Sequence, residues 1–122
     1  MPPKILVVED NDRNRRLIRI VLKSKGYEVI EAVTAEEAIV QLNNEPIDLI
    51  LMDIQLPKMD GLALAKEIKE NPATKDIPII ALTAYAMKGD REKFLAAGCD
   101  DYIGKPVDTQ KLPKVVAGFL DN

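Results

Sequence analysis

The sequence predicts an α/β fold, a (βα)5 domain in which five parallel strands form one sheet with helices on both faces. Five short apolar runs alternate with segments of helical period, as they do in consecutive βαβ units. The runs are KILVV (4–8), EVIEA (28–32), DLILM (48–52), IPIIAL (77–82) and DYIG (101–104). The first, third and fourth are almost continuously apolar, which is typical of central parallel strands covered on both faces. EVIEA is more polar and is predicted to lie at an edge of the sheet.

The segments between these runs have the spacing and end signals of helices. Apolar side chains repeat at helical spacing from Leu17 to Leu22, and Gly26 can end that helix. Thr34 and Glu37 form a capping-box pattern at the start of the second helix. The third and fourth helices are predicted at about 61–70 and about 87–97, the latter followed by Gly98. A fifth follows Asp108, and Pro113 requires either that it begin near Leu112 or that its first turn be distorted.

Length and composition narrow the class of protein. The 122 residues predict one domain over 1–122 with no output domain, and no linker, repeat or low-complexity tract interrupts the pattern. The net charge of -3 argues against a nucleic-acid binder, and no apolar run approaches the ~20 residues that a membrane span needs. The start, MPPKILVVED, reaches acidic residues too early for a signal peptide. A cytoplasmic monomer without membrane or nucleic-acid partners is therefore expected.

Two residue types limit the chemistry that a site can use. The sequence has no histidine, which removes histidine bases, histidine-dependent triads and histidine metal ligands together. Its single cysteine, Cys99, can form no internal disulfide and is predicted to be a small buried hydrophobe. The only basic cluster is Arg13, Arg15, Arg16 and Arg19, which is predicted to be a solvated helix face. Any site must therefore use carboxylates, hydroxyls and lysine.

Polar side chains of that kind occur where the predicted strands end. Glu9 and Asp10 follow the first run, Asp53 the third, Thr83 the fourth and Lys105 the fifth. In open parallel sheets, ligands bind outside the carboxyl ends of the strands, so these groups are expected to converge. Each alone has a simpler explanation as a turn, cap or surface residue, and Asp12 and Asp60 keep that explanation. Together they predict a Mg²⁺ site at which Asp53 accepts a phosphoryl group.

The sequence resembles the receiver domains of two-component response regulators over essentially its whole length. The matching stretches are VVEDN, LILMDIQLPKMDG, IIALTA and DDYIGKP. The resemblance implies a flavodoxin-like three-layer sandwich with strand order 2-1-3-4-5. It also implies a cis peptide bond between Lys105 and Pro106.

The resemblance assigns a role to each matching residue. Asp53 is the implied phosphoacceptor, and the metal is implied to bind Asp53, Asp10 and the backbone carbonyl of Gln55, with Glu9 acting directly or through water. Lys105 would contact the phosphoryl group. Thr83 would be the switch hydroxyl and Tyr102 the switch aromatic.

The resemblance also implies partners. The phosphoryl donor would be a phosphohistidine on a sensor histidine kinase or a histidine phosphotransfer protein. The downstream protein partner is not identified by the sequence, but it would contact residues near the switch: Tyr85, Ala86, Met87 and Tyr102. Gln55 and Tyr85 would flank the path by which water reaches the phosphoryl group, and the bulky Tyr85 is expected to slow hydrolysis.

Three alternatives stay open at this point. Aspartyl-phosphate phosphatases also place an aspartate after an apolar strand, but they use an Asp-x-Asp pair, and this chain has Gln55 at the second position. Such an enzyme would turn over a substrate, whereas a receiver would catalyse only its own phosphorylation and dephosphorylation. A flavodoxin-like binding module needs a hydroxyl- and glycine-rich phosphate loop, and EDNDRN is acidic. The chain can also be a receiver fragment of a larger hybrid kinase.

Overall fold

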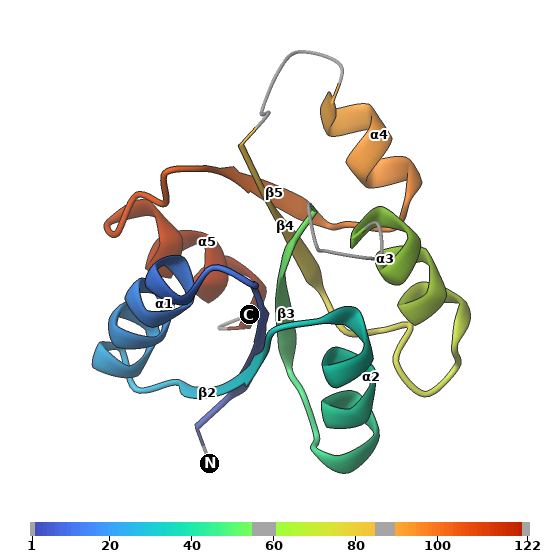
Figure 1. Ribbon diagram of the computed structural model, residues 1–122, viewed down its shortest axis with the longest axis horizontal. Coiled ribbons are helices and arrows are strands. Elements are labelled where there is room, and N and C mark those ends of the chain that lie inside the picture. Colours follow the sequence, from blue (N-terminus) through green and yellow to red (C-terminus); the bar gives the residue numbers. More distant parts are fainter. Residues whose placement is uncertain (1, 55–60, 85–89, 121–122) are drawn as a thin grey trace.

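The computed structural model describes residues 2–54, 61–84 and 90–120. Five strands in these ranges are Lys4–Val8 (β1), Glu28–Ala32 (β2), Leu49–Asp53 (β3), Ile79–Thr83 (β4) and Asp101–Gly104 (β5). They form one parallel sheet in the order β2-β1-β3-β4-β5, with β2 at an edge (Figure 1). The predicted α/β class, strand order and edge strand are confirmed.

Five helices cover the two faces of the sheet. Helices α1 (Asp12–Ser24) and α5 (Lys111–Leu120) lie on one face. Helices α2 (Ala35–Asn44), α3 (Gly61–Glu70) and α4 (Asp90–Ala96) lie on the other, which completes a three-layer sandwich (Figure 1). None of the helices in the described ranges is long and apolar enough to cross a membrane.

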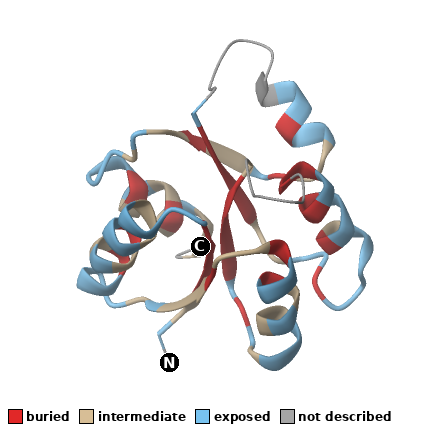
Figure 2. Ribbon diagram, viewed as in Figure 1, coloured by how far each residue is buried: buried red, intermediate tan, exposed pale blue. Residues whose placement is uncertain are grey.

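The continuous apolar runs are explained by burial on both faces of the sheet. Every residue of β3 and β4 is buried (Figure 2). Successive side chains of a strand point to opposite faces, so Ile5 and Val7 pack with α1 and α5, whereas Leu6 and Val8 pack with the helices opposite. A central parallel strand therefore needs apolar side chains at every position, which is the pattern that predicted the class.

The predicted end signals act at the helix ends. The Thr34 side chain accepts a hydrogen bond from the backbone N of Glu37 at 3.1 Å, as the capping-box pattern predicts. Gly26 and Gly98 follow α1 and α4 with φ values of +91° and +103°, which glycine adopts without strain. The expected first turn of the fourth helix, from about Met87, lies outside the described residues before Asp90.

The last helix resolves the alternatives that Pro113 raised. Helix α5 begins at Lys111, so Pro113 is its third residue, where a backbone N–H has no partner within the helix. The Asp108 side chain accepts hydrogen bonds from the backbone N atoms of Gln110 and Lys111 at 2.8 and 3.2 Å. Asp108 thus caps the turn at 109–110 that leads into the helix, and α5 begins close to Leu112, as in the first alternative.

Cys99 has the predicted structural role. It is buried within the apolar cluster that β3, β4 and α2–α4 share. Burial raises the pKa of its thiol to about 11. The thiol therefore stays protonated near neutral pH and is a poor nucleophile and a poor metal ligand.

Candidate functional site

Parallel strand pairing brings the predicted polar residues to one edge of the sheet. Asp53 pairs with Leu82, and Thr83 pairs with Gly104, so β3, β4 and β5 end at nearly the same level. Glu9 follows β1 directly and Lys105 follows β5. Asp53 and Thr83 are the last residues of their strands, and both are buried, at 3% and 2% exposed.

Three carboxylates form a cluster at this edge. One oxygen each from Glu9, Asp10 and Asp53 can be chosen so that all three lie within 4.8 Å of one another. Glu9 and Asp53 are buried, whereas Asp10 is exposed and lies where the cluster meets solvent. A donor set made of oxygen alone, with one side open to water, fits a hard cation of the Mg²⁺ type.

Lys105 bridges two of these carboxylates. Its Nζ lies 2.9 Å from Asp53 Oδ2 and 3.0 Å from Glu9 Oε1. Burial lowers the pKa of Lys105, but the hydrogen bonds that its ammonium donates to Asp53 and Glu9 outweigh burial and raise it, so the ammonium stays charged. The Lys105–Pro106 peptide bond is cis, as the resemblance implied.

The cluster holds more negative charge than Lys105 offsets. Burial and the adjacent Asp53 carboxylate raise the pKa of Glu9 to about 7, although hydrogen bonds from Asn14 and Lys105 act in the opposite direction. The pKa of Glu9 is raised because one ammonium, that of Lys105, faces two buried carboxylates. The protonated form of one of the two carboxyl groups is therefore favoured. A divalent cation would remove this imbalance.

Sequence reasoning missed the contribution of α1. Arg13 and Arg16 are exposed, as a solvated helix face requires, but Arg15 is only 16% exposed. Arg15 donates hydrogen bonds to Glu31 of β2 at 3.1 Å and to the backbone oxygen of Glu9 at 3.0 Å. The interpretation of the arginine cluster as a solvated face was therefore wrong for Arg15, and Arg19 is also partly buried, with Nη1 2.9 Å from Glu31 Oε2. Glu31 could have indicated this contact from the sequence. It is an acid in the edge strand, and its carboxylate needs a cationic partner once β2 packs beside α1.

Gly61 allows α3 to begin directly beside Asp53. A Cβ on Gly61 would lie 2.5 Å from the backbone oxygen of Asp53 and 2.8 Å from Cα of Ile54. Both neighbours are backbone atoms, so they cannot move aside as a flexible side chain would. The close contact with the backbone therefore explains why position 61, at the end of the MDG segment, is a glycine.

Gly61→Ala is expected to displace the backbone at Asp53 and to lower the free energy of unfolding by about 1–3 kcal/mol. Urea denaturation of the metal-free protein measures the change. Gly118→Ala is the control, because a Cβ there meets nothing within 4 Å and alanine is the better helix former. Equal stability changes in the two variants would contradict the steric argument.

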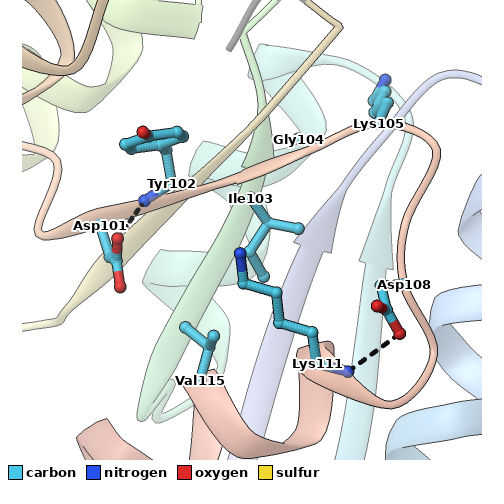
Figure 3. Close-up of a pocket in the computed structure, with 8 residues that line it drawn as sticks. All are labelled: Asp101, Tyr102, Ile103, Gly104, Lys105, Asp108, Lys111 and Val115. Atoms are coloured by element: carbon cyan, nitrogen blue, oxygen red, sulfur yellow. Dashed lines mark hydrogen bonds between the residues drawn. The ribbon is translucent and has the colours of Figure 1, made fainter.

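The two predicted switch residues lie on neighbouring strands. Thr83 ends β4, and Tyr102 of β5 places its ring 5.8 Å from that of Phe94 on α4. Figure 3 shows Tyr102 and Lys105 on one side of β5 and Ile103 on the other, toward α5. A surface pocket of about 660 Å³ runs along β5 and α5 and has Lys105 in its lining.

Some predicted residues cannot be placed. Gln55, Asp60, Tyr85, Ala86 and Met87 lie outside the described residues. Their predicted roles in metal binding, in the turn, in hydrolysis and in partner contact therefore stay predictions.

Comparisons with known proteins agree with this geometry. The sequence profile of the response regulator receiver domain matches residues 5–117. The polar-differentiation response regulator DivK of Brucella anthropi is 40% identical over 120 residues, with 98% of each chain covered. The receiver domain of a Pseudomonas aeruginosa sensor histidine kinase, solved with a magnesium ion coordinated in its active site cleft, superposes with a TM-score of 0.90 at 37% identity, covering 100% of both chains.

A second solved structure extends the match to a chemotaxis protein. CheY4 of Vibrio cholerae superposes with a TM-score of 0.92 at 26% identity, covering 98% of this chain and 99% of that one. The carboxylate cluster, the bridging lysine and the five-stranded sheet are thus found in a chain whose sequence and fold both match one family. The protein belongs to the response regulator receiver domain family, the phosphoacceptors of two-component signalling.

Proposed function

We propose that Asp53 of this receiver accepts a phosphoryl group from a phosphohistidine with Mg²⁺ as cofactor. The observation that carries the proposal is the position of Asp53 Oδ2, 2.9 Å from Lys105 Nζ and in a cluster with Glu9 and Asp10. The donor is a histidine on a sensor kinase or on a phosphotransfer protein, because the chain has no histidine.

In the proposed reaction, an oxygen of the Asp53 carboxylate attacks the phosphorus of the phosphohistidine. A P–O bond forms, the P–N bond breaks, and the imidazole leaves with the bonding electron pair and takes up a proton. Lys105 would offset negative charge on the transferring oxygens, and the Thr83 hydroxyl would donate a hydrogen bond to them. Bound Mg²⁺, held by Asp10, Asp53 and the Gln55 carbonyl with Glu9, would supply further positive charge.

The output of this reaction is proposed to be a change in the binding surface. Thr83 would move toward the phosphoryl group and Tyr102 would change its ring position, which alters the surface around β5. We propose that this receiver acts through its own surface, as a monomer in the cytoplasm. The DivK response regulators, which are matched over 98% of their length, support a regulator of this type. The protein that binds this surface is unassigned.

Incubation with a phosphorylated histidine phosphotransfer protein tests the proposal. We expect Mg²⁺-dependent transfer of label to the chain, with the acid stability and base lability of an acyl phosphate, and EDTA should prevent it. Sustained release of phosphate from a phosphate ester, with no labelled intermediate of this kind, would instead support the phosphatase alternative.

Tyr85 is predicted to slow hydrolysis of the phosphoryl group. Tyr85→Ala should speed loss of label from the purified phosphoprotein at saturating Mg²⁺, because a small side chain would open the path for water. Tyr85→Phe is the control and should retain the slow rate, since it keeps the ring. A rate that is unchanged or slower in Tyr85→Ala would show that Tyr85 does not shield the site.

A further inference from the structure

We propose that Asn14 is a positioning residue that holds the Glu9 carboxylate in place for the metal, an inference that rests on the proposed function. Asn14 Nδ2 donates a hydrogen bond to Glu9 Oε1 at 2.9 Å. An ionised carboxylate can only accept hydrogen bonds, so the amide nitrogen, and not the amide oxygen, must face it. Asn14 thus reaches from α1 into the carboxylate cluster without being a candidate ligand.

The local structure of α1 explains how Asn14 reaches Glu9. Asn11 caps the helix, and its side chain accepts a hydrogen bond from the backbone N of Asn14 at 2.9 Å. Asn14 is therefore the third helical residue, a position from which side chains commonly turn back to the cap. Here the side chain turns back further, to Glu9. Asparagine is also a poorer helix former than alanine, so the helix itself gives no reason for it.

The rest of Glu9 is already fixed, which leaves its side chain as the part that needs positioning. The backbone N of Glu9 donates to the oxygen of Ala32 at 3.0 Å. Its backbone oxygen accepts a hydrogen bond from Arg15, which Glu31 holds in turn. With both backbone groups bound, the direction of the carboxylate depends on its own contacts.

Those contacts are of two kinds. Lys105 donates to the same oxygen, Glu9 Oε1, at 3.0 Å, and also contacts Asp53. In the proposed function Lys105 turns to the phosphoryl group and gives up part of its contact with Glu9. Asn14 can keep its hydrogen bond throughout, and as a neutral donor it does not repel a cation. It therefore holds Glu9 toward Asp10 and Asp53 when the Lys105 ammonium turns to the phosphoryl group.

Asn14→Ala and Asn14→Leu test the proposal, because both remove the donor but only alanine also removes the bulk. Calorimetric titration with Mg²⁺ should give a Kd about 10-fold or more weaker in both variants, as is usual when a residue that orients a metal ligand is lost. The half-saturating Mg²⁺ concentration for phosphorylation by a small acyl phosphate should rise by the same factor, while the rate at saturating Mg²⁺ changes less. Asn43→Ala, the same change at an exposed position of α2, is the control and should leave Kd unchanged.

A double-mutant cycle separates positioning from general destabilisation. In a Glu9→Ala background, the carboxylate that Asn14 positions is gone, so Asn14→Ala should change the Mg²⁺ Kd by less than about two-fold. A two-fold change is about the error within which the effects of independent substitutions add. An equal loss of affinity with and without Glu9 would overturn the proposal, as would an Asn14→Ala or Asn14→Leu variant that binds Mg²⁺ as the wild type does. Failure of the wild-type protein to bind Mg²⁺ would instead overturn the metal site of the proposed function.

Discussion

Asp53→Asn is expected to abolish phosphorylation by phosphohistidine donors and by small acyl phosphates. The amide oxygen of asparagine is a poor nucleophile, so the variant lacks the group that is proposed to attack the phosphorus. Loss of a nucleophile commonly lowers a rate by about 10³-fold or more, so label should fall below detection. The measurement is incorporation of labelled phosphate with Mg²⁺ present, together with circular dichroism to show that the variant is folded.

Asp76→Asn is the matched control for this experiment. Asp76 is an exposed acid in the connection between α3 and β4, at the opposite end of the sheet from the site. It undergoes the same chemical change and should be labelled like the wild type. Full labelling of Asp53→Asn would show that another residue accepts the phosphoryl group.

Without magnesium, the free energy of unfolding is expected to fall as the pH rises from about 5 to about 8. The folded-state pKa of Glu9 is about 7, above its ordinary value of 4.5, because burial and Asp53 disfavour the carboxylate. The folded protein therefore binds this proton more tightly than the unfolded chain, and the resulting stability is full below pH 4.5 and is lost as the pH passes 7. The loss is on the order of a few kcal/mol.

Magnesium should reverse this loss at the upper pH. A cation that binds ionised carboxylates in the folded state stabilises that state selectively. Millimolar Mg²⁺ should therefore raise the unfolding midpoint more at about pH 8 than at about pH 5. Urea titrations at both pH values, with Mg²⁺ or EDTA, measure the effect. Glu9→Gln should be nearly insensitive to pH in EDTA over this range. A wild-type midpoint that is indifferent to both pH and Mg²⁺ would contradict the assigned charge imbalance.

A carboxylate whose pKa is lowered, such as that of Asp108, does not produce the same signature. Backbone hydrogen bonds from Gln110 and Lys111 lower the pKa of Asp108 below 3.8. Its contribution to stability is therefore present above that pH and is lost only in more acidic solution, outside the range of the experiment. A fall in stability between pH 5 and 8 thus reports a group whose pKa is raised.

The α/β class, the order of elements and most of their limits could be predicted from the sequence. The reason is that these features depend on local patterns: apolar runs at strand spacing, a threonine with a glutamate three residues later, and glycine after a helix. Strand order and the cis peptide bond came from the family resemblance. The sequence left the start of α5 open, because Pro113 is compatible with two local structures until Asp108 is seen to cap the helix.

The convergence of Glu9, Asp10, Asp53 and Lys105 could also be predicted, since the carboxyl ends of parallel strands share one edge. What only the tertiary structure decided was the environment of each group. The rotation of α1 against β1 and β2 turns Asn14 toward Glu9 and Arg15 toward Glu31, and no spacing in the sequence specifies that rotation. The approach of α3 to β3 likewise requires Gly61, and the raised pKa of Glu9 depends on burial by residues distant in the chain. Residue type and strand end determine which groups meet, but side-chain packing decides their distances, their charge and their partners.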